Sequence, residues 1–154
     1  MLTPEERQEI EAEFAQYPNR RAVSIDALKI LQRHRGWVSD ETLRDLGELL
    51  DMTTDELDGV ATFYNLVFRK PVGRHVVMVC DSVSCWIMGS ERLCQRLTSR
   101  LGVGLGETTP DGRFTVLPIV CLGACDHAPT LMVDDDLYRD VNPEKLGELL
   151  EQYE

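Results

Sequence analysis

Two closely spaced cysteine pairs are the residues of this sequence best suited to chemistry. They are Cys80 with Cys85, and Cys121 with Cys125. Each pair directly follows an apolar run that is typical of a buried strand, residues 76–79 and 116–120 respectively. The stretch between the pairs is long enough for a helix and a returning strand. Two neighbouring strands of one sheet are therefore expected to bring the four sulfurs to a common point.

Four thiolates can hold either iron or zinc, because both metals accept sulfur ligands in near-tetrahedral sets. The four-residue gap of the first pair is also that of plant-type [2Fe-2S] ferredoxins, whereas zinc sites more often use two intervening residues. Gly123 and Ala124 let the main chain approach a cluster closely, and Ser82 and Ser84 add hydroxyl donors. The residues favour a [2Fe-2S] cluster over structural zinc, with unliganded core thiols as a third interpretation.

The fifth cysteine and the histidines are expected to lie outside this site. Cys94 falls in a helical stretch beside Leu93 and Leu97, where a free thiol behaves as a small hydrophobe. Four cysteines already complete the ligand set, so His127 is not needed as a ligand. Neither pair has the Cys-x-x-Cys spacing of a dithiol oxidoreductase, and no nucleotide-binding or Ser/His/Asp motif is present. We therefore expect another chain to supply the substrate site of any redox reaction.

The composition is that of an acidic globular chain. The 154 residues carry a formal net charge of −11, which repels nucleic acid, so nucleic acid is not an expected partner. No apolar run approaches the roughly 20 residues of a membrane span, and the N-terminus lacks the pattern of a signal peptide. We expect a soluble cytosolic protein with no direct membrane insertion. In a reducing cytosol, clustered thiols are more often metal ligands than disulfides.

Residues 1–68 are predicted to form a small helical bundle. The four expected helices begin at the capping residues Thr3, Ser24, Ser39 and Thr53. The first is expected to run to about Tyr17, the second to end at Gly36, and the fourth to continue through Leu66.

A polar stretch with Pro and Gly at residues 69–74 marks a domain boundary, which gives an N-terminal helical domain over 1–73 and a second domain over 74–154. In the second domain the patterns predict strands over 75–79, 113–120 and 130–133, with a hairpin turn at Asp111-Gly112. Helices are predicted over 88–101 and after Asn142. This order indicates an α/β domain with three layers, a small sheet with helices on both of its faces.

Several motifs carry a resemblance to a known family. They are Cys80-x4-Cys85 with Asp81-Ser82, Gly112-Arg113-Phe114, Cys121-Leu-Gly-Ala-Cys125-x-x-Ala128-Pro129 and, in the helical domain, Val60-Ala-Thr-Phe-Tyr64. Together they resemble the small thioredoxin-like [2Fe-2S] subunit of the NADH-oxidising module of respiratory complex I, which in bacteria is the E-subunit. The resemblance spans essentially the whole chain.

The resemblance implies a thioredoxin-like [2Fe-2S] ferredoxin domain behind the helical domain. It implies one cluster whose ligands are Cys80, Cys85, Cys121 and Cys125. It also implies an electron-transfer subunit of NADH:quinone oxidoreductase that exchanges single electrons with FMN and has no complete active site of its own. The implied partners are a larger flavoprotein that binds FMN and NADH, forming a heterodimer with this chain, and further iron-sulfur subunits. The complex would hold the chain at the inner face of the cell membrane. Related subunits serve NAD-reducing hydrogenases and NAD-dependent formate dehydrogenases, so the equivalent subunit of such an enzyme is one alternative. From the residues alone, the other alternative is a zinc-stabilised adaptor protein without a redox role.

Overall fold

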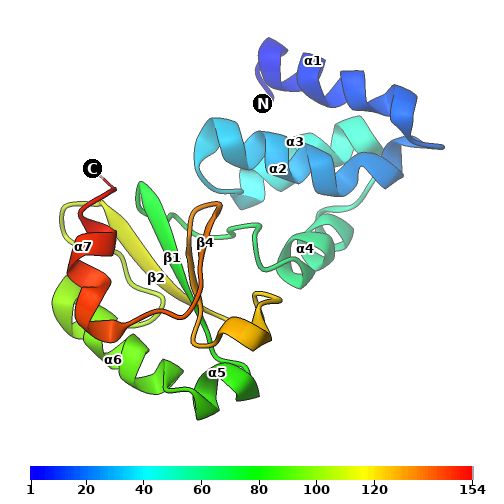
Figure 1. The fold of residues 1–154 in the computed structure, drawn as a ribbon. Helices are drawn as coiled ribbons and strands as arrows, with labels where there is room; N and C mark the ends of the chain where they lie inside the picture. Colours follow the sequence, from blue (N-terminus) through cyan, green and yellow to red (C-terminus); the bar gives the residue numbers. More distant parts are fainter. Residues whose placement is uncertain (154) are drawn as a thin grey trace. The chain divides into compact units, whose positions relative to one another are not determined.

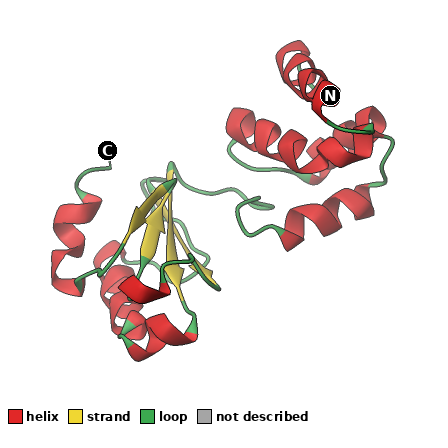
Figure 2. Cartoon of the chain, turned by 45° about the vertical axis from the view of Figure 1, so that its right-hand side comes forward, coloured by secondary structure: helices red, strands yellow, loops and turns green. Residues whose placement is uncertain are grey.

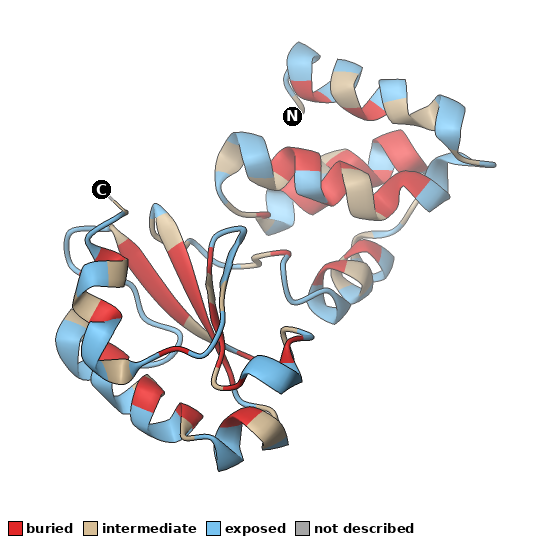
Figure 3. Cartoon of the chain, in the orientation of Figure 1, coloured by how far each residue is buried: buried red, intermediate tan, exposed pale blue. Residues whose placement is uncertain are grey.

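The computed structural model describes residues 1–153, and the chain divides into two compact units (Figure 1). The first unit, Met1–Pro71, contains helices only, and the second, Val72–Glu154, contains the sheet and three helices (Figure 2). Each unit has a buried core of its own (Figure 3).

The helical unit begins with two helices whose ends follow from local hydrogen bonding. Helix α1 (Pro4–Glu13) starts with a capping box, in which the Thr3 hydroxyl accepts from the Glu6 N–H and the Glu6 carboxylate accepts from the Thr3 N–H. Helix α2 (Ser24–Arg35) ends at Gly36 in the left-handed conformation, at φ 80°. The expectation that Ser24 caps this helix was wrong. Asn19 is the capping residue, because its side chain accepts from Ala22 N–H and starts a 3-10 turn that leads into the helix.

The remaining two helices start where the sequence predicts. Helix α3 (Asp40–Leu50) is capped by Ser39, and helix α4 (Thr54–Phe63) by a capping box of Thr53 and Glu56. Helix α4 is shorter than expected. The backbone is already extended at Tyr64, so the exposed side chains of Tyr64 and Leu66 lie beyond the helix.

A charged pair is buried with the leucine-rich core of the helical unit. Glu6 is 2% exposed, and both of its carboxylate oxygens lie 2.6 Å from the guanidinium nitrogens of Arg35. The hydrogen bonds from Arg35 lower the pKa of Glu6 to about 2, against the effect of burial, which alone would raise it. The pair therefore ties the first turn of α1 to the last turn of α2.

The second unit is built on a four-stranded mixed sheet with the strand order β2-β1-β3-β4. Strand β1 spans His75–Cys80, β2 Phe114–Ile119, β3 Leu131–Val133 and β4 Asp136–Tyr138. Strands β1 and β2 are parallel, with Cys80 opposite Ile119, whereas β3 runs antiparallel to β1 and β4 antiparallel to β3. The three predicted strands are present within a residue or two of their expected ends, and β4 was not predicted.

Three helices accompany this sheet. The predicted helix over 88–101 corresponds to α6 (Ser90–Leu101), and the short helix α5 (Val83–Ile87), separated from it by Gly89 at φ 96°, was not predicted. Asn142 caps a 3-10 turn, Pro143–Lys145, that leads into α7 (Leu146–Leu150).

Helices α6 and α7 lie on the same side of the sheet (Figure 1). Leu93 and Leu97 of α6 and Leu146 of α7 belong to one buried cluster with alternate residues of β1, β2 and β3, which point to one face. The expectation of helices on both faces is thus corrected. The α/β class is confirmed.

Candidate metal centre

The parallel pairing of β1 and β2 positions the four cysteines. Cys80 is the last residue of β1, and Cys121 lies two residues beyond the end of β2. The main chains of β1 and β2 remain hydrogen-bonded just beyond Cys80, because the N–H of Asp81 donates to the carbonyl of Ile119 over 3.0 Å. Both cysteine loops consequently leave the sheet at the same edge.

The first pair is buried. Cys80 and Cys85 are each 1% exposed, and Cys85 is held in the short helix α5. Burial alone would raise the pKa of the Cys80 thiol. Hydrogen bonds from the Ser82 hydroxyl, 3.3 Å from Sγ, from the backbone N–H groups of Ser82 and Leu122 and from Cys85 outweigh burial and lower this pKa to about 7. The ligand form of cysteine is the thiolate, which this environment favours.

The second pair is exposed. The sulfurs of Cys121 and Cys125 lie 3.7 Å apart, and the N–H of Gly123, at φ 75°, donates to Sγ of Cys121 over 3.3 Å. The pKa of Cys125 is raised, chiefly by its hydrogen bond with Cys121 and by the charge of that neighbour, and the charge of Cys80 adds to the rise. The two pairs are therefore close enough to interact electrically.

The sequence analysis named most of the groups that surround the sulfurs. Ser82 and Gly123 contact Cys80 and Cys121 as described, and the Ser84 hydroxyl opposes the rise in the pKa of Cys125. One group was missed. The hydroxyl of Thr130 lies 3.5 Å from Sγ of Cys85, and no spacing rule indicates it, because the contact arises from the pairing of β3 with β1.

The donor set matches a [2Fe-2S] cluster, in which each iron takes two thiolates. The thiols form two pairs, and peptide N–H groups and hydroxyls point at the sulfurs, as a cluster with charged thiolate ligands requires. In residues 1–153, no three His, Cys, Asp or Glu side chains are grouped as ligands of a single metal ion.

Cys94 and the histidines make contacts of other kinds. Cys94 packs against the core of the sheet unit, where burial raises the pKa of its thiol. Nδ1 of His127 donates to a carboxylate oxygen of Asp140 over 2.8 Å. His34 and His75 likewise contact Glu9 and Asp134. That these residues lie outside the ligand set stays a prediction.

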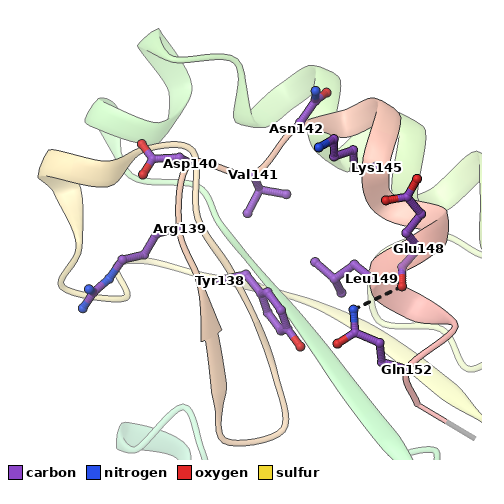
Figure 4. Close-up of a pocket in the computed structure, with 9 residues that line it drawn as sticks. All are labelled: Tyr138, Arg139, Asp140, Val141, Asn142, Lys145, Glu148, Leu149 and Gln152. Carbon is purple, nitrogen blue, oxygen red and sulfur yellow. Dashed lines mark hydrogen bonds between the residues drawn. The ribbon is translucent and has the colours of Figure 1, made fainter.

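A cavity of about 240 Å³ adjoins the buried pair. Its lining residues are Val79, Cys80, Asp81, Trp86, Ser90, Glu91, Cys94, Leu105 and Pro118. A second cavity, of about 360 Å³, lies between α7 and the segment that follows β4 (Figure 4). Its lining contains no cysteine, and its two basic residues, Arg139 and Lys145, are matched by Asp140 and Glu148. Of these two cavities, the first is the one lined by a cysteine of the buried pair, Cys80.

Five exposed apolar side chains are sequence neighbours of Cys85 and Cys121. Val83, Trp86, Ile87 and Met88 of α5 and the turn after it, together with Val120 beside Cys121, are each at least 60% exposed. We call these five residues the apolar rim. Single exposed apolar residues are common, but a contiguous group of them marks an interaction surface. No helix among residues 1–153 has the length and apolar character that crossing a bilayer requires.

Comparison with known proteins agrees with this geometry. The thioredoxin-like [2Fe-2S] ferredoxin family matches the chain over residues 10–154. The E-subunit of the NADH-quinone oxidoreductase of Pseudomonas aeruginosa is 51% identical over 153 residues, which cover 99% of this chain and 92% of that protein. The protein of the same name from Escherichia coli K12 is 47% identical over 152 residues, again 99% of this chain and 92% of the relative.

A solved structure supports the fold over most of the chain. The crystal structure of an NAD+-reducing [NiFe]-hydrogenase in the H2-reduced state matches 81% of this chain with a TM-score of 0.68 and 24% identity, and this chain spans 21% of that longer one. That likeness concerns the fold alone. From the family match and the two relatives, we conclude that the chain belongs to the thioredoxin-like [2Fe-2S] ferredoxin family and, within it, to the E-subunits of NADH-quinone oxidoreductases.

Proposed function

We propose that this chain is the electron-transfer subunit of the NADH-oxidising module of an NADH:quinone oxidoreductase. Cys80, Cys85, Cys121 and Cys125 hold one [2Fe-2S] cluster, which when bound supplies one-electron redox chemistry. The observation that carries the proposal is the meeting of two thiol pairs at the ends of two parallel strands. The two quinone-oxidoreductase relatives, at 51% and 47% identity, favour this parent complex over a hydrogenase.

The residues of the chain hold and orient such a centre. The Ser82 hydroxyl and the N–H groups of Leu122 and Gly123 offset negative charge on the sulfurs. The buried pair keeps one side of the site away from water, whereas the exposed pair leaves the other side accessible to a redox partner.

The first test is metal content. Anaerobically purified protein is expected to be red-brown and to contain about two irons and about two sulfides per chain, the content of one [2Fe-2S] cluster. Zinc without iron would identify the alternative, a zinc-stabilised adaptor with no redox role.

The ligand assignment has its own test. Cys80→Ser and Cys125→Ser each remove one thiolate, so the visible absorption and the iron content should fall several-fold or vanish. Cys94→Ser is the matched control, because Cys94 packs beside the core, and it should leave the spectrum intact. Loss of the cluster in Cys94→Ser alone would overturn the assignment.

We further propose that the partner is a larger flavoprotein that binds FMN and NADH, forms a heterodimer with this chain and covers the apolar rim. The rim lies beside the exposed thiols, so a flavoprotein seated on it would bring its flavin close to the cluster and exclude water. Phe63 and Tyr64, exposed at the end of α4, offer the helical unit a contact surface of the same kind. Further iron-sulfur subunits complete the complex, which holds the chain on the cytoplasmic side of the cell membrane.

Co-purification tests this interface. The full chain, co-expressed with its candidate partner, should bring down a protein with bound FMN in high salt, and Trp86→Asp should weaken the association at least tenfold. Leu137→Asp is the control, since Leu137 is a partly exposed apolar residue of β4 outside the rim. Equal loss in both variants, or a stable complex without flavin, would contradict the proposed interface.

A further inference from the structure

Thr130 is a buried residue that touches the site from the third strand. It directly precedes β3, and its carbonyl accepts a hydrogen bond from the N–H of Cys80 over 3.2 Å. Thr130 is 1% exposed, and its hydroxyl oxygen lies 3.5 Å from Sγ of Cys85, which is also 1% exposed. The contact is thus enclosed by protein on both sides.

The hydroxyl of Thr130 has a defined role in this contact. Buried hydroxyls are almost always hydrogen-bonded, and within residues 1–153 Cys85 is the partner that this hydroxyl has. A free thiol can donate to a hydroxyl, but a ligand thiolate has no proton. When Cys85 serves as a ligand, Thr130 is the donor and the sulfur is the acceptor.

The other sulfurs receive their hydrogen bonds differently. Cys121 accepts from a peptide N–H in an exposed loop, and Cys80 accepts from Ser82, which is only half-buried. Water can therefore reach the sulfur of Cys121 and, at Cys80, the partly exposed Ser82 that donates to it. At Cys85 it cannot, because both Cys85 and Thr130 are buried.

We propose that Thr130 tunes the reduction potential of the centre through its hydrogen bond to Cys85. The inference rests on the proposed function, because it requires Cys85 to be a cluster ligand. Reduction adds one negative charge to the centre, and a donor pointed at a ligand sulfur stabilises the more negative state. In a buried, low-dielectric place this effect is larger than at the surface. The Thr130 hydroxyl therefore raises the potential.

The test compares variants of the full chain that differ by single groups. Thr130→Val keeps the shape of the side chain and removes the hydroxyl, whereas Thr130→Ser keeps the hydroxyl. Thr115→Val is the control. Thr115 is a buried threonine of β2 whose hydroxyl bonds Thr108 and the N–H of Gly73, and it pairs with Val76 near the start of β1, away from the cysteines. The midpoint potential of each protein is measured by titration monitored with EPR.

We expect Thr130→Val to lower the equilibrium constant for taking up an electron about tenfold, which for a one-electron couple is about 59 mV toward negative potential. Thr130→Ser and Thr115→Val should stay within about threefold of the unsubstituted protein, that is, within half of that potential shift. Pulsed EPR in D2O gives an independent reading. An exchangeable proton coupled to the reduced centre should be present in the unsubstituted protein and in Thr130→Ser, and absent in Thr130→Val.

The outcomes separate this inference from the proposed function. If the unsubstituted protein holds no iron, the proposed function fails. If it holds the cluster and Thr130→Val has the same potential, only the role of Thr130 is overturned. If Thr130→Val cannot retain the cluster, retention in both Thr130→Ser and Thr115→Val would still assign the hydroxyl to the centre. Loss in both Thr130 variants would show that packing, and not the hydroxyl, is what the site needs.

Discussion

The four cysteines are not equivalent, because Cys80 and Cys85 are closed off from water and Cys121 and Cys125 are open to it. Spacing identifies the two pairs, and the adjacent Ser and Gly residues identify the donors within each loop. Spacing does not indicate that Cys80 and Cys85 are buried while Cys121 and Cys125 are exposed. Burial depends on what the sheet and α5 enclose, and so does the contact with Thr130, which only the β1–β3 pairing creates.

Two aspartates adjoin cysteines that we propose as ligands, and they provide a test of local charge. Asp81 follows Cys80, Asp126 follows Cys125, and both side chains are exposed. Removing a negative charge favours the reduced centre, so Asp81→Asn and Asp126→Asn should each raise the midpoint potential. Water screens exposed charges, so each shift should stay below about 59 mV, the value of a tenfold change for one electron.

Asp135→Asn is the control for these two variants. Asp135 lies in the turn between β3 and β4, at the end of the sheet where β1 begins, away from the cysteines. The midpoint potential of Asp135→Asn should match that of the unsubstituted protein. An equal rise in all three variants would mean that net charge, and not position, sets the effect.

At the scale of elements, helix starts were predicted better than helix interiors or short strands. Thr3, Ser39 and Thr53 cap helices as expected, because a capping hydroxyl and a glutamate are local signals. The short helix α5 before Gly89 was missed, because its five residues are too few to display a helical period. Strand β4 has three residues, too few to display an alternating pattern.

Two helical glycines are expected to respond in opposite ways to alanine. A Cβ at Gly47 in α3 would lie 2.5 Å from the carbonyl oxygen of Met52, whereas a Cβ at Gly59 in α4 meets nothing within 4 Å. Alanine is favoured over glycine in a helix by about 0.8–1 kcal/mol, so Gly59→Ala should raise the melting temperature. Gly47→Ala should lower it, because a clash with a main-chain atom costs about 1–3 kcal/mol. Thermal unfolding of both variants decides this, and stabilisation by Gly47→Ala would contradict the packing described.

The pair of Glu6 and Arg35 predicts a dependence of stability on pH. The pKa of Glu6 is lowered from about 4.5 to about 2 in the folded chain, so its contribution is fully present above pH 4.5 and is lost as the pH falls from 4.5 toward 2. The shift corresponds to about 3 kcal/mol at neutral pH. Glu6→Gln should destabilise the helical unit by this order at pH 7, and the difference from the unsubstituted protein should shrink near pH 3. Urea unfolding followed by far-UV circular dichroism measures both.

Glu9→Gln on the same helix is the comparison. Glu9 pairs with Arg33 and His34 at the surface, where its side chain is 42% exposed, and exposed pairs contribute about 0–1 kcal/mol. A loss as large as that of Glu6→Gln would show that burial of the Glu6 pair is not what matters.

At the scale of the whole molecule, the change from helical to strand-like periodicity predicts two domains, 1–73 and 74–154. The compact units, Met1–Pro71 and Val72–Glu154, divide the chain two residues earlier. All four proposed ligands and Thr130 lie in the second unit. The buried apolar cluster that packs against the sheet is also formed entirely by residues of this unit. The acidic charge of −11 tells against nucleic acid but leaves the partner surface undefined, because charge does not locate an interface.

We expect the second unit alone to carry the iron. Residues 72–154, produced without the helical unit, should bind iron and sulfide at the ratio found for the full chain, and residues 1–71 should bind neither. Iron analysis and visible absorption of the two fragments measure this. Iron in the full chain but not in residues 72–154 would show that the helical unit is needed to form the site.

The exposure of Cys121 and Cys125 also bears on the order of biogenesis. Iron and sulfide can reach the site past these two exposed sulfurs, whereas Cys80 and Cys85 are each 1% exposed. A partner seated on the apolar rim would close that route. We therefore expect iron and sulfide to be inserted into this chain before it binds its partner. A chain that binds its partner without iron would remain without iron in the assembled complex.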